Sequence, residues 1–340
     1  MLAARYLGPN RIEAVEVPIP SIGEEEALIS IQACGFCGSD LGIVAGIHPR
    51  AKAPLTLGHE FCGTIEEIRT KTTTLKPGDQ VTAYPLISCG NCYVCRTGAP
   101  HVCRTLRLYG FDEDGAMARY VRLPVSSLFR LPAGMSPLVG AVIEPLAVAV
   151  HGVSCVPIDT EARAVVVIGA GPIGLLTALV ARARGARRVF ISDILPSRIE
   201  LAKQFGLNAI KAGAELKDLI DRETSGDGAD LVFECVGGPE TAKEMTSLVR
   251  SRGTIVNLGV SKKPVEVDMQ AVNFKEITIV GSRVYRRQDF KQAIELASSL
   301  GVHRIVTHTF PIVEVKSAFE YFHKGNDVCK VLILPNGAVQ

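Results

Sequence analysis

The segment 162–193 constrains the fold more than any other part of the sequence, because it reads as strand, tight turn, helix and second strand. Residues 164–168 form an uninterrupted apolar run, rich in valine, as is typical of a strand buried on both faces of a parallel sheet. The following turn matches the pattern G-x-G-x-x-G at residues 169–174. In such a turn the glycines permit a sharp bend, close approach of a pyrophosphate, and tight packing of helix on strand. The segment therefore predicts a dinucleotide-binding unit.

The continuation of this segment supports the same prediction. Residues 175–184 favour a helix, whose N-terminus would attract an anion, and the strand 188–192 leads to Asp193, 19 residues after Gly174. A carboxylate there accepts hydrogen bonds from ribose hydroxyls and repels a 2′-phosphate, so we expect NAD rather than NADP. Arg198 could instead bind a 2′-phosphate, although a solvated cation on a helix face is the simpler interpretation. The expected cofactor contacts are Gly169, Gly171, Pro172, Ile173, Gly174, Asp193, Arg198, Val236, Leu258, Gly259, Ser282 and Arg283.

Length and charge narrow the class of protein. A chain of 340 residues is about twice a typical domain, which predicts two domains. The 37 basic and 35 acidic residues give a net charge of +2, so nothing favours nucleic acid or a membrane surface as partner. The N-terminus lacks the apolar core of a secretion signal, and we expect a cytoplasmic protein. The apolar segment 138–156 contains Glu144, Pro145 and His151, which predict a buried helix rather than a membrane span.

The rhythm of the chain changes near residue 162. Before it, short strands separated by glycine and proline predict a barrel-like β domain, with a turn-rich segment at 34–40 leading into a short helix. After it, strands and helices alternate, as in a parallel sheet. A final strand at 331–334 is expected to return to the first domain. The expected strands are 12–17, 27–33, 57–65, 80–84, 118–123, 229–236, 253–259 and 277–281, and the expected helices are 199–205, 241–250 and 290–300.

Four of the ten cysteines fall within 15 residues, at Cys89, Cys92, Cys95 and Cys103. Without a secretion signal, such a cluster favours metal or thiol chemistry over disulfides. Four thiolates in one loop can close a tetrahedral shell around zinc, which predicts a structural zinc site. Alternatives are a redox pair, four unrelated buried cysteines, and an iron–sulfur cluster.

A second set of possible metal ligands is dispersed over Cys37, His59, Glu60 and Glu144. One thiolate, one imidazole and one or two carboxylates would make a zinc site with a position open to water or substrate. The spacing alone would not establish this site, and whether Glu60 or Glu144 completes the shell stays open. Asp40 is expected to accept a hydrogen bond from His59 and so fix its tautomer.

Taken together and in order, these motifs resemble those of the zinc-dependent medium-chain dehydrogenases/reductases. The resemblance rests on Cys37-Gly38-Ser39-Asp40, Gly58-His59-Glu60, the four-cysteine loop, Glu144-Pro145-Leu146 and the dinucleotide turn, and it covers essentially the whole chain. The glutamate after the histidine and the E-P-L motif are similar to the polyol and sugar-acid branch, related to sorbitol and L-galactonate dehydrogenases. The resemblance implies an α/β protein with a GroES-like β-barrel catalytic domain, residues 1–146 completed by 291–340, and a Rossmann NAD-binding domain with a doubly wound parallel sheet, residues 147–290. It also implies two zinc ions per chain and a homodimer or homotetramer.

The expected activity is transfer of a hydride from a secondary hydroxyl of a polyol, sugar or sugar acid to NAD⁺, with Cys37, Ser39, His59, Glu60 and Glu144 as the catalytic set. Many relatives carry a proton-relaying histidine or tyrosine where this chain has Gly42 and Ile43, so the proton route beyond Ser39 is open. Sorbitol dehydrogenases tend to have an Arg-Tyr pair where this chain has Val284-Tyr285, and Arg283 is the expected contact for a substrate carboxylate. Alternatives are another zinc alcohol or L-threonine-type dehydrogenase, or a catalytically silent nucleotide-binding relative.

Overall fold

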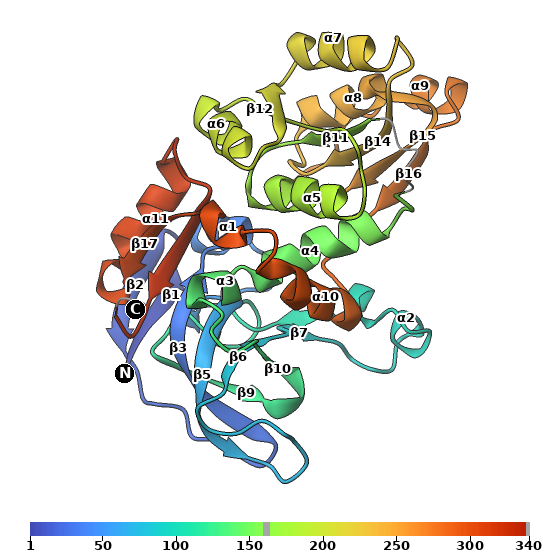
Figure 1. Cartoon of the computed structure of the whole chain (residues 1–340). Helices are drawn as coiled ribbons and strands as arrows, with labels where there is room; N and C mark the ends of the chain where they lie inside the picture. Colours follow the sequence, from blue (N-terminus) through green and yellow to red (C-terminus); the bar gives the residue numbers. More distant parts are fainter. Residues whose placement is uncertain (159–163, 338–340) are drawn as a thin grey trace. The chain divides into compact units, whose positions relative to one another are not determined.

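A computed structural model describes residues 1–158 and 164–337 of the chain (Figure 1). They form two compact units, the first comprising 1–144 and 286–340 and the second 145–285. Residues 162 and 163, the first two of the predicted dinucleotide segment, lie outside the described residues.

The first unit is rich in short strands. Its strands are β1 (Leu2–Gly8), β2 (Arg11–Glu16), β3 (Glu26–Gly35), β4 (Leu55–Thr56), β5 (Glu60–Arg69), β6 (Gln80–Ala83), β7 (Leu86–Ile87), β8 (Arg107–Leu108), β9 (Tyr120–Pro124), β10 (Leu128–Arg130), β17 (Val306–Pro311) and β18 (Lys330–Leu334). Its helices are α1 (Gly38–Val44), α2 (Tyr93–Arg96), α3 (Pro137–Gly140), α10 (Arg287–Ala297) and α11 (Val315–Lys324). Single 3₁₀ turns occur at Pro100–Val102, Val125–Ser127, Val302–Ile305 and Ile312–Glu314.

The main sheet of this unit has the order β10-β6-β5-β3-β18-β17, with β9 also paired to β3. From Glu26 to Ala33 every second residue of β3 is buried, as expected for a strand with one face on a core, and the last residues, Cys34 and Gly35, are both buried. Side chains from β3, β5 and β18 meet in one apolar cluster that includes Ile29, Ile31, Ile65 and Ile333. The pairing of β18 with β3 confirms that the last strand returns to the first unit.

The second unit is a parallel sheet with the order β13-β12-β11-β14-β15-β16. The chain moves outward from β11 in one direction and then returns to start again at β14, so the strand order reverses between these two strands. Ligands in such sheets bind beyond the carboxyl ends of the strands at this point. The strands are β11 (Val165–Ile168), β12 (Val189–Asp193), β13 (Asn208–Lys211), β14 (Ala229–Glu234), β15 (Val249–Asn257) and β16 (Thr278–Gly281).

Helices cover both faces of this sheet (Figure 1). Val166 and Ile168 pack in one cluster with Leu216 of α7 (Ala214–Glu223) and Met245 of α8 (Pro239–Leu248). The start of α5 (Pro172–Ala183) lies on the opposite face, near Val167. The remaining helices are α4 (Ile143–Ser154), which begins in the first unit, α6 (Pro196–Gln204) and α9 (Met269–Phe274).

The sequence predictions need several corrections. The strand expected at 57–65 begins at Glu60, and Cys34 and Gly35, expected in a turn, belong to β3. The single helix expected at 138–156 is two helices, α3 and α4. Among the described residues, no helix combines the length and apolar character that crossing a bilayer requires. The elements that were not predicted are the strands β1, β4, β7, β8, β10, β13 and β17 and the helices α2, α7, α9 and α11.

Candidate active site

Cys37, His59 and Glu60 come together in the first unit. Cys37 immediately precedes α1, whereas His59 and Glu60 stand at the start of β5. One potential ligand atom from each lies within 4.8 Å of those of the other two. Thus β3, α1 and β5 bring Cys37 close to His59 and Glu60, from which it is distant in the sequence.

These three residues fit a zinc ion by their chemistry and their surroundings. Thiolate, imidazole and carboxylate are the ligands zinc prefers, and three protein ligands leave a position for substrate. His59 and Glu60 are buried, and His59 Nδ1 has no hydrogen-bond partner in the described part of the chain. Burial would lower the pKa of His59, but its hydrogen bond to Cys37 and the charges of Cys37, Glu144 and Glu60 raise that pKa to about 10. The site is therefore strongly electronegative and suited to a cation.

Lys330, which the sequence analysis missed, completes this group from β18. Its Nζ forms an ion pair with Glu60 Oε2 and donates a hydrogen bond to the Phe36 carbonyl at 2.8 Å, with both charged side chains almost fully buried. A Cβ at Gly35 would lie 2.4 Å from Glu60 Oε2 and 3.0 Å from Lys330 Cε. Only glycine leaves room for the pair. The signal in the sequence was a lysine at the head of an otherwise apolar strand.

Asp40 does not have the predicted role. Its Oδ2 accepts a hydrogen bond from the Cys37 amide at 2.9 Å, while its Oδ1, like His59 Nδ1, has no partner within residues 1–158 and 164–337. Burial raises the pKa of Asp40 to about 6, against the opposing charge of His59. Asp40 therefore acts on His59 through its charge and fixes the backbone at Cys37, because the start of α1 needs an acceptor for that amide.

The two other predicted catalytic residues lie near the group. Ser39 belongs to α1, two residues after Cys37, and its buried Oγ has no partner in the described residues. Glu144 is buried in the first turn of α4 and acts electrostatically on His59 and Lys330. It stands outside the group of three whose ligand atoms meet. Its ligation of zinc stays a prediction.

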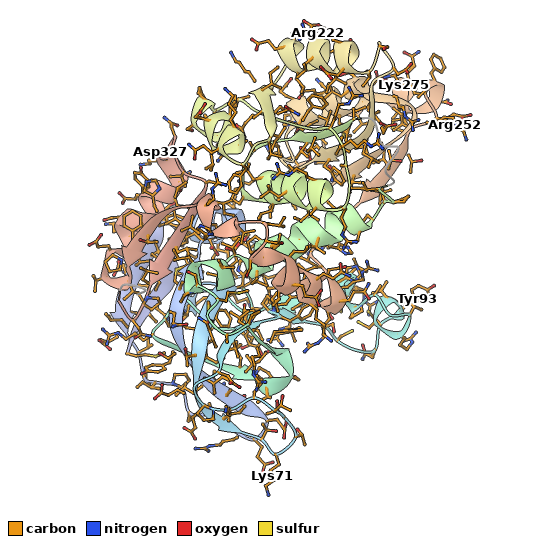
Figure 2. The ribbon with its side chains drawn as sticks, in the orientation of Figure 1. Lys71, Tyr93, Arg222, Arg252, Lys275 and Asp327 are labelled. Carbon is orange, nitrogen blue, oxygen red and sulfur yellow. The ribbon has the colours of Figure 1, made fainter. Side chains whose placement is uncertain are left out.

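The four-cysteine loop also gathers its sulfurs. All four Sγ atoms lie within 4.8 Å of one another, with Cys92–Cys95, Cys92–Cys103 and Cys89–Cys95 separations of 3.4, 3.9 and 4.0 Å. A tetrahedron with Zn–S bonds of 2.3 Å requires about 3.8 Å between sulfurs, so the loop fits zinc. None of the ten cysteines, all within the described residues, forms a disulfide. Backbone N–H groups of Asn91 and Cys92 lower the pKa of Cys89 to about 6. Tyr93 of α2 lies at the surface of this loop (Figure 2).

In the second unit, the glycine-rich turn joins β11 to α5 as the sequence predicted. Gly169 has φ of +96°, and a Cβ at Gly174 would lie 1.7 Å from the Gly169 carbonyl oxygen. Gly171 is the N-cap of α5, and Pro172 occupies its first turn. Ile173 follows within the same turn. The turn thus presents a helix N-terminus at the carboxyl edge of the sheet, where a pyrophosphate is stabilised.

Asp193 and Arg198 lie beside this turn. Asp193 Oδ2 accepts from the Ala170 amide at 2.8 Å and Oδ1 from the Leu195 amide at 2.9 Å. Arg198 Nη1 is 3.6 Å from Asp193 Oδ2 and 3.7 Å from where a Cβ of Gly171 would lie. The carboxylate is thus held in place by the backbone, and Arg198 partly balances its charge.

A second residue that the sequence analysis missed joins two loops at this edge. Glu234 ends β14 and is buried; its Oε1 accepts from the Val236 and Gly237 amides at 2.9 and 2.8 Å. Its carbonyl accepts from the Leu258 and Gly259 amides after β15. One glutamate therefore positions three of the predicted cofactor contacts, Val236, Leu258 and Gly259. In the sequence, Glu234 could have been noticed as a charged residue at the end of an otherwise apolar strand.

Ser282 and Arg283 follow β16 at the same edge. The Ser282 amide donates to the Asn257 carbonyl at 2.9 Å, its Oγ is buried with no partner in the described residues, and Arg283 is exposed. Val284 has φ of +40°, which is unfavourable for a β-branched residue. Such strain concentrates at functional sites.

Comparisons with known proteins agree with both halves of this description. Residues 23–133 match the family model of the alcohol dehydrogenase GroES-like domain, and residues 172–299 match that of zinc-binding dehydrogenase. The chain is 36% identical over 333 residues to an L-threonine 3-dehydrogenase of Bacillus subtilis, covering 94% of each protein. It is 33% identical over 337 residues to a 2-dehydro-3-deoxy-L-galactonate 5-dehydrogenase of Pseudoalteromonas atlantica, covering 98% of each.

A solved structure gives the same result for the fold. A zinc-binding dehydrogenase from Sinorhizobium meliloti bound to NADP superposes with a TM-score of 0.89 at 32% identity, covering 98% of this chain and 99% of that one. The predicted fold, GroES-like plus Rossmann-type, is confirmed. The chain therefore belongs to the zinc-binding dehydrogenases of the medium-chain family, oxidoreductases that use NAD(P).

Proposed function

We propose that this enzyme oxidises a secondary hydroxyl of a sugar acid, or of a related polyhydroxylated compound, to the ketone with NAD⁺. The observation that carries the proposal is the meeting of Cys37, His59 and Glu60 in one buried, electronegative group. Ser39 and the ordered turn at residues 169–174 support it, because the reaction needs a proton acceptor and a held nucleotide.

The residues divide the chemistry between them. Zinc held by Cys37, His59 and Glu60 would supply a Lewis acid that lowers the pKa of the substrate hydroxyl. Ser39 Oγ, which lacks a partner in the described residues, accepts the hydroxyl proton and passes it toward water. The nicotinamide cofactor, which the turn at residues 169–174 and Asp193 would hold, would supply the acceptor for the hydride that leaves the same carbon. One alcohol and one NAD⁺ thus give one ketone, one NADH and one proton.

The more specific part of the proposal is the class of substrate. L-Threonine and 2-dehydro-3-deoxy-L-galactonate, named for the two relatives, both carry a carboxylate beside their hydroxyl groups. Arg283 is exposed after β16, and a guanidinium binds a carboxylate with two parallel hydrogen bonds. We therefore favour an acid over a neutral polyol, with L-threonine as the second candidate.

Turnover of an aldonate and of its matching neutral alditol, with L-threonine as a third substrate, tests this proposal. In Arg283→Ala, kcat/KM for the aldonate should fall about 10- to 100-fold, since a charged hydrogen bond contributes roughly 1.5–3 kcal/mol. The alditol should change less than about twofold. Arg252→Ala is the control: Arg252 is an exposed arginine within β15, with its guanidinium 3.6 Å from Glu276. An unchanged aldonate-to-alditol ratio in Arg283→Ala would remove Arg283 from the site.

We also propose that NAD⁺ is preferred over NADP⁺. Both Asp193 oxygens accept hydrogen bonds from backbone amides, which hold the carboxylate beside the glycine-rich turn, and a fixed negative charge there would repel a 2′-phosphate. Steady-state kinetics with each cofactor should give kcat/KM at least about tenfold higher for NAD⁺, the equivalent of about 1.4 kcal/mol. The NADP in the Sinorhizobium structure makes this a demanding test. A higher value with NADP⁺ would assign Arg198 to the phosphate.

We also propose that the enzyme forms a homodimer or homotetramer. In the second unit, Phe274 and Met269 of α9 are 79% and 64% exposed, and the edge strand β16 follows α9 in the chain. Large apolar side chains next to an open strand edge favour association. Sedimentation of the purified protein would show the oligomeric state.

A further inference from the structure

The loop that follows α1 carries a histidine one aromatic ring away from the candidate zinc ligands. The ring centroids of His48 and Phe111 are 5.1 Å apart, and those of Phe111 and His59 are 5.0 Å apart. The imidazoles of His48 and His59 therefore lie within about 10 Å of each other. Phe111 and His59 are buried, whereas His48 is only half-buried. His48 thus stands between the buried group and the surface.

The backbone of His48 is tied to the helix that carries Ser39. Its amide donates to the Gly42 carbonyl at 3.1 Å, and the Ile47 amide donates to the same oxygen at 3.0 Å. Gly42 follows Ser39 by three residues in α1 and so shares its face of the helix. A Cβ at Gly42 would contact only Ile47, at 3.9 Å, so the helix surface beside His48 is open.

The imidazole is fixed in one tautomer. Its Nδ1 accepts hydrogen bonds from the Ala51 amide at 3.1 Å and the Arg50 amide at 3.4 Å. A ring nitrogen that accepts cannot carry the proton, so the neutral ring has its proton on Nε2. Within residues 1–158 and 164–337, the structure gives Nε2 no hydrogen-bond partner.

The surroundings of His48 favour its neutral form. Partial burial and the nearby charge of Arg50 lower its pKa below the ordinary value, while Asp112 opposes them. Arg50 and Asp112 are themselves paired at 3.3 Å, which limits what either contributes alone. His48 is therefore an oriented, neutral donor of one hydrogen bond.

We propose that His48 Nε2–H donates a hydrogen bond to a substrate hydroxyl remote from the reacting carbon, which makes His48 a specificity-determining residue. The proposal rests on the proposed function, because only a polyhydroxylated substrate has such a hydroxyl. A span of less than about 10 Å between the two imidazoles suits a sugar-acid chain whose reacting end lies at His59. The simple alternative is that His48 only stabilises its own turn through Nδ1.

His48→Asn separates these two roles. Asparagine places an oxygen where Nδ1 stands and accepts from the same amides, as in an Asx turn, but it has no donor at the position of Nε2. The thermal midpoint should therefore stay near that of the wild type. Ile47→Ala is the matched control in the same loop, since the Ile47 side chain is 65% exposed.

The experiment compares kcat/KM for an aldonate with that for a short secondary alcohol that has no further hydroxyl. In His48→Asn, kcat/KM for the aldonate should fall about 3- to 10-fold through KM, as expected for one neutral hydrogen bond, while the short alcohol changes less than about twofold. Calorimetric titration of the aldonate into the enzyme–NADH complex should show the same loss in Kd without turnover. Ile47→Ala should leave both substrates unaffected.

The outcomes that overturn the proposal are distinct from failure of the function itself. If the wild type oxidises the aldonate and His48→Asn weakens both substrates equally, or neither, His48 has only its structural role. If the wild type oxidises short alcohols and no polyhydroxylated compound, the proposed function and the role of His48 are both wrong.

Discussion

The four-cysteine loop and the Cys37 group offer donor atoms suited to the same metal, but they need very different amounts of the chain. All ligands of the loop fall between residues 89 and 103, and Cys89 is exposed. The Cys37 group draws on α1, β5 and the start of β18, and Lys330 bonds a carbonyl 294 residues earlier in the sequence. We therefore expect the shape of the loop to depend on a bound metal ion, and that of the buried group to depend on the fold.

This difference explains the surroundings of each site. In the loop, hydrogen bonds from backbone amides lower the pKa of Cys89. The four sulfurs of the loop lie within 4.8 Å of one another. In the Cys37 group, burial makes every charge expensive, so Lys330 balances Glu60, and Asp40 holds the Cys37 amide. A saturated site with local ligands suits a structural role, and a buried site with three ligands suits catalysis.

The largest expected effect comes from removing one cysteine from each site. Cys37→Ser should lower turnover by at least about a thousandfold, because a Lewis acid supplies several kcal/mol of transition-state stabilisation, while the thermal midpoint changes little. Cys95→Ser should mainly reduce stability and the yield of folded protein, since structural zinc sites contribute folding energy directly. Steady-state kinetics and thermal unfolding of both variants check this. Equal effects of the two substitutions on both measurements would contradict the division of roles.

The next effect concerns the ion pair that only the buried site has. Lys330→Met should lower the free energy of unfolding by about 3–5 kcal/mol, because it leaves the Glu60 carboxylate buried without its partner. Lys316→Met, at an exposed position of α11, should change it by less than about 0.5 kcal/mol. Urea denaturation with zinc and after chelation measures both.

The same measurement tests whether Glu60 is a zinc ligand in the absence of substrate. If Glu60 binds zinc, the metal replaces part of the lost charge, and the cost of Lys330→Met should be smaller with zinc than without it. If Lys330→Met lowers the free energy of unfolding no more than Lys316→Met does, the Lys330–Glu60 ion pair does not stabilise the buried carboxylate.

The sequence predicted features that are set within one or two neighbouring elements, but not contacts between residues that are far apart in the sequence. The glycine turn, the four-cysteine loop and Asp193 are set by neighbours within one or two elements. The turn joins β11 to α5, the four sulfurs lie within 4.8 Å of one another, and Asp193 ends β12, while their binding roles stay predictions. Lys330 escaped prediction because its partners Glu60 and Phe36 are far away in the sequence. Glu234 escaped because its side chain binds the backbone amides of Val236 and Gly237, and the backbone carbonyl that reaches Leu258 and Gly259 leaves no mark on the sequence. The predicted Asp40–His59 hydrogen bond is not formed in the described residues: Asp40 Oδ2 accepts from the Cys37 amide, whereas Asp40 Oδ1 and His59 Nδ1 have no partner there.

Zinc content per chain in the wild type, Cys37→Ser and Cys95→Ser tests the central claim most directly. Two independent sites with separate roles predict two zinc ions in the wild type and one in Cys37→Ser, which should remain folded. In Cys95→Ser, the folded fraction should retain one zinc together with activity. A wild type without zinc, or a Cys37→Ser variant that keeps both ions and its activity, would contradict the account.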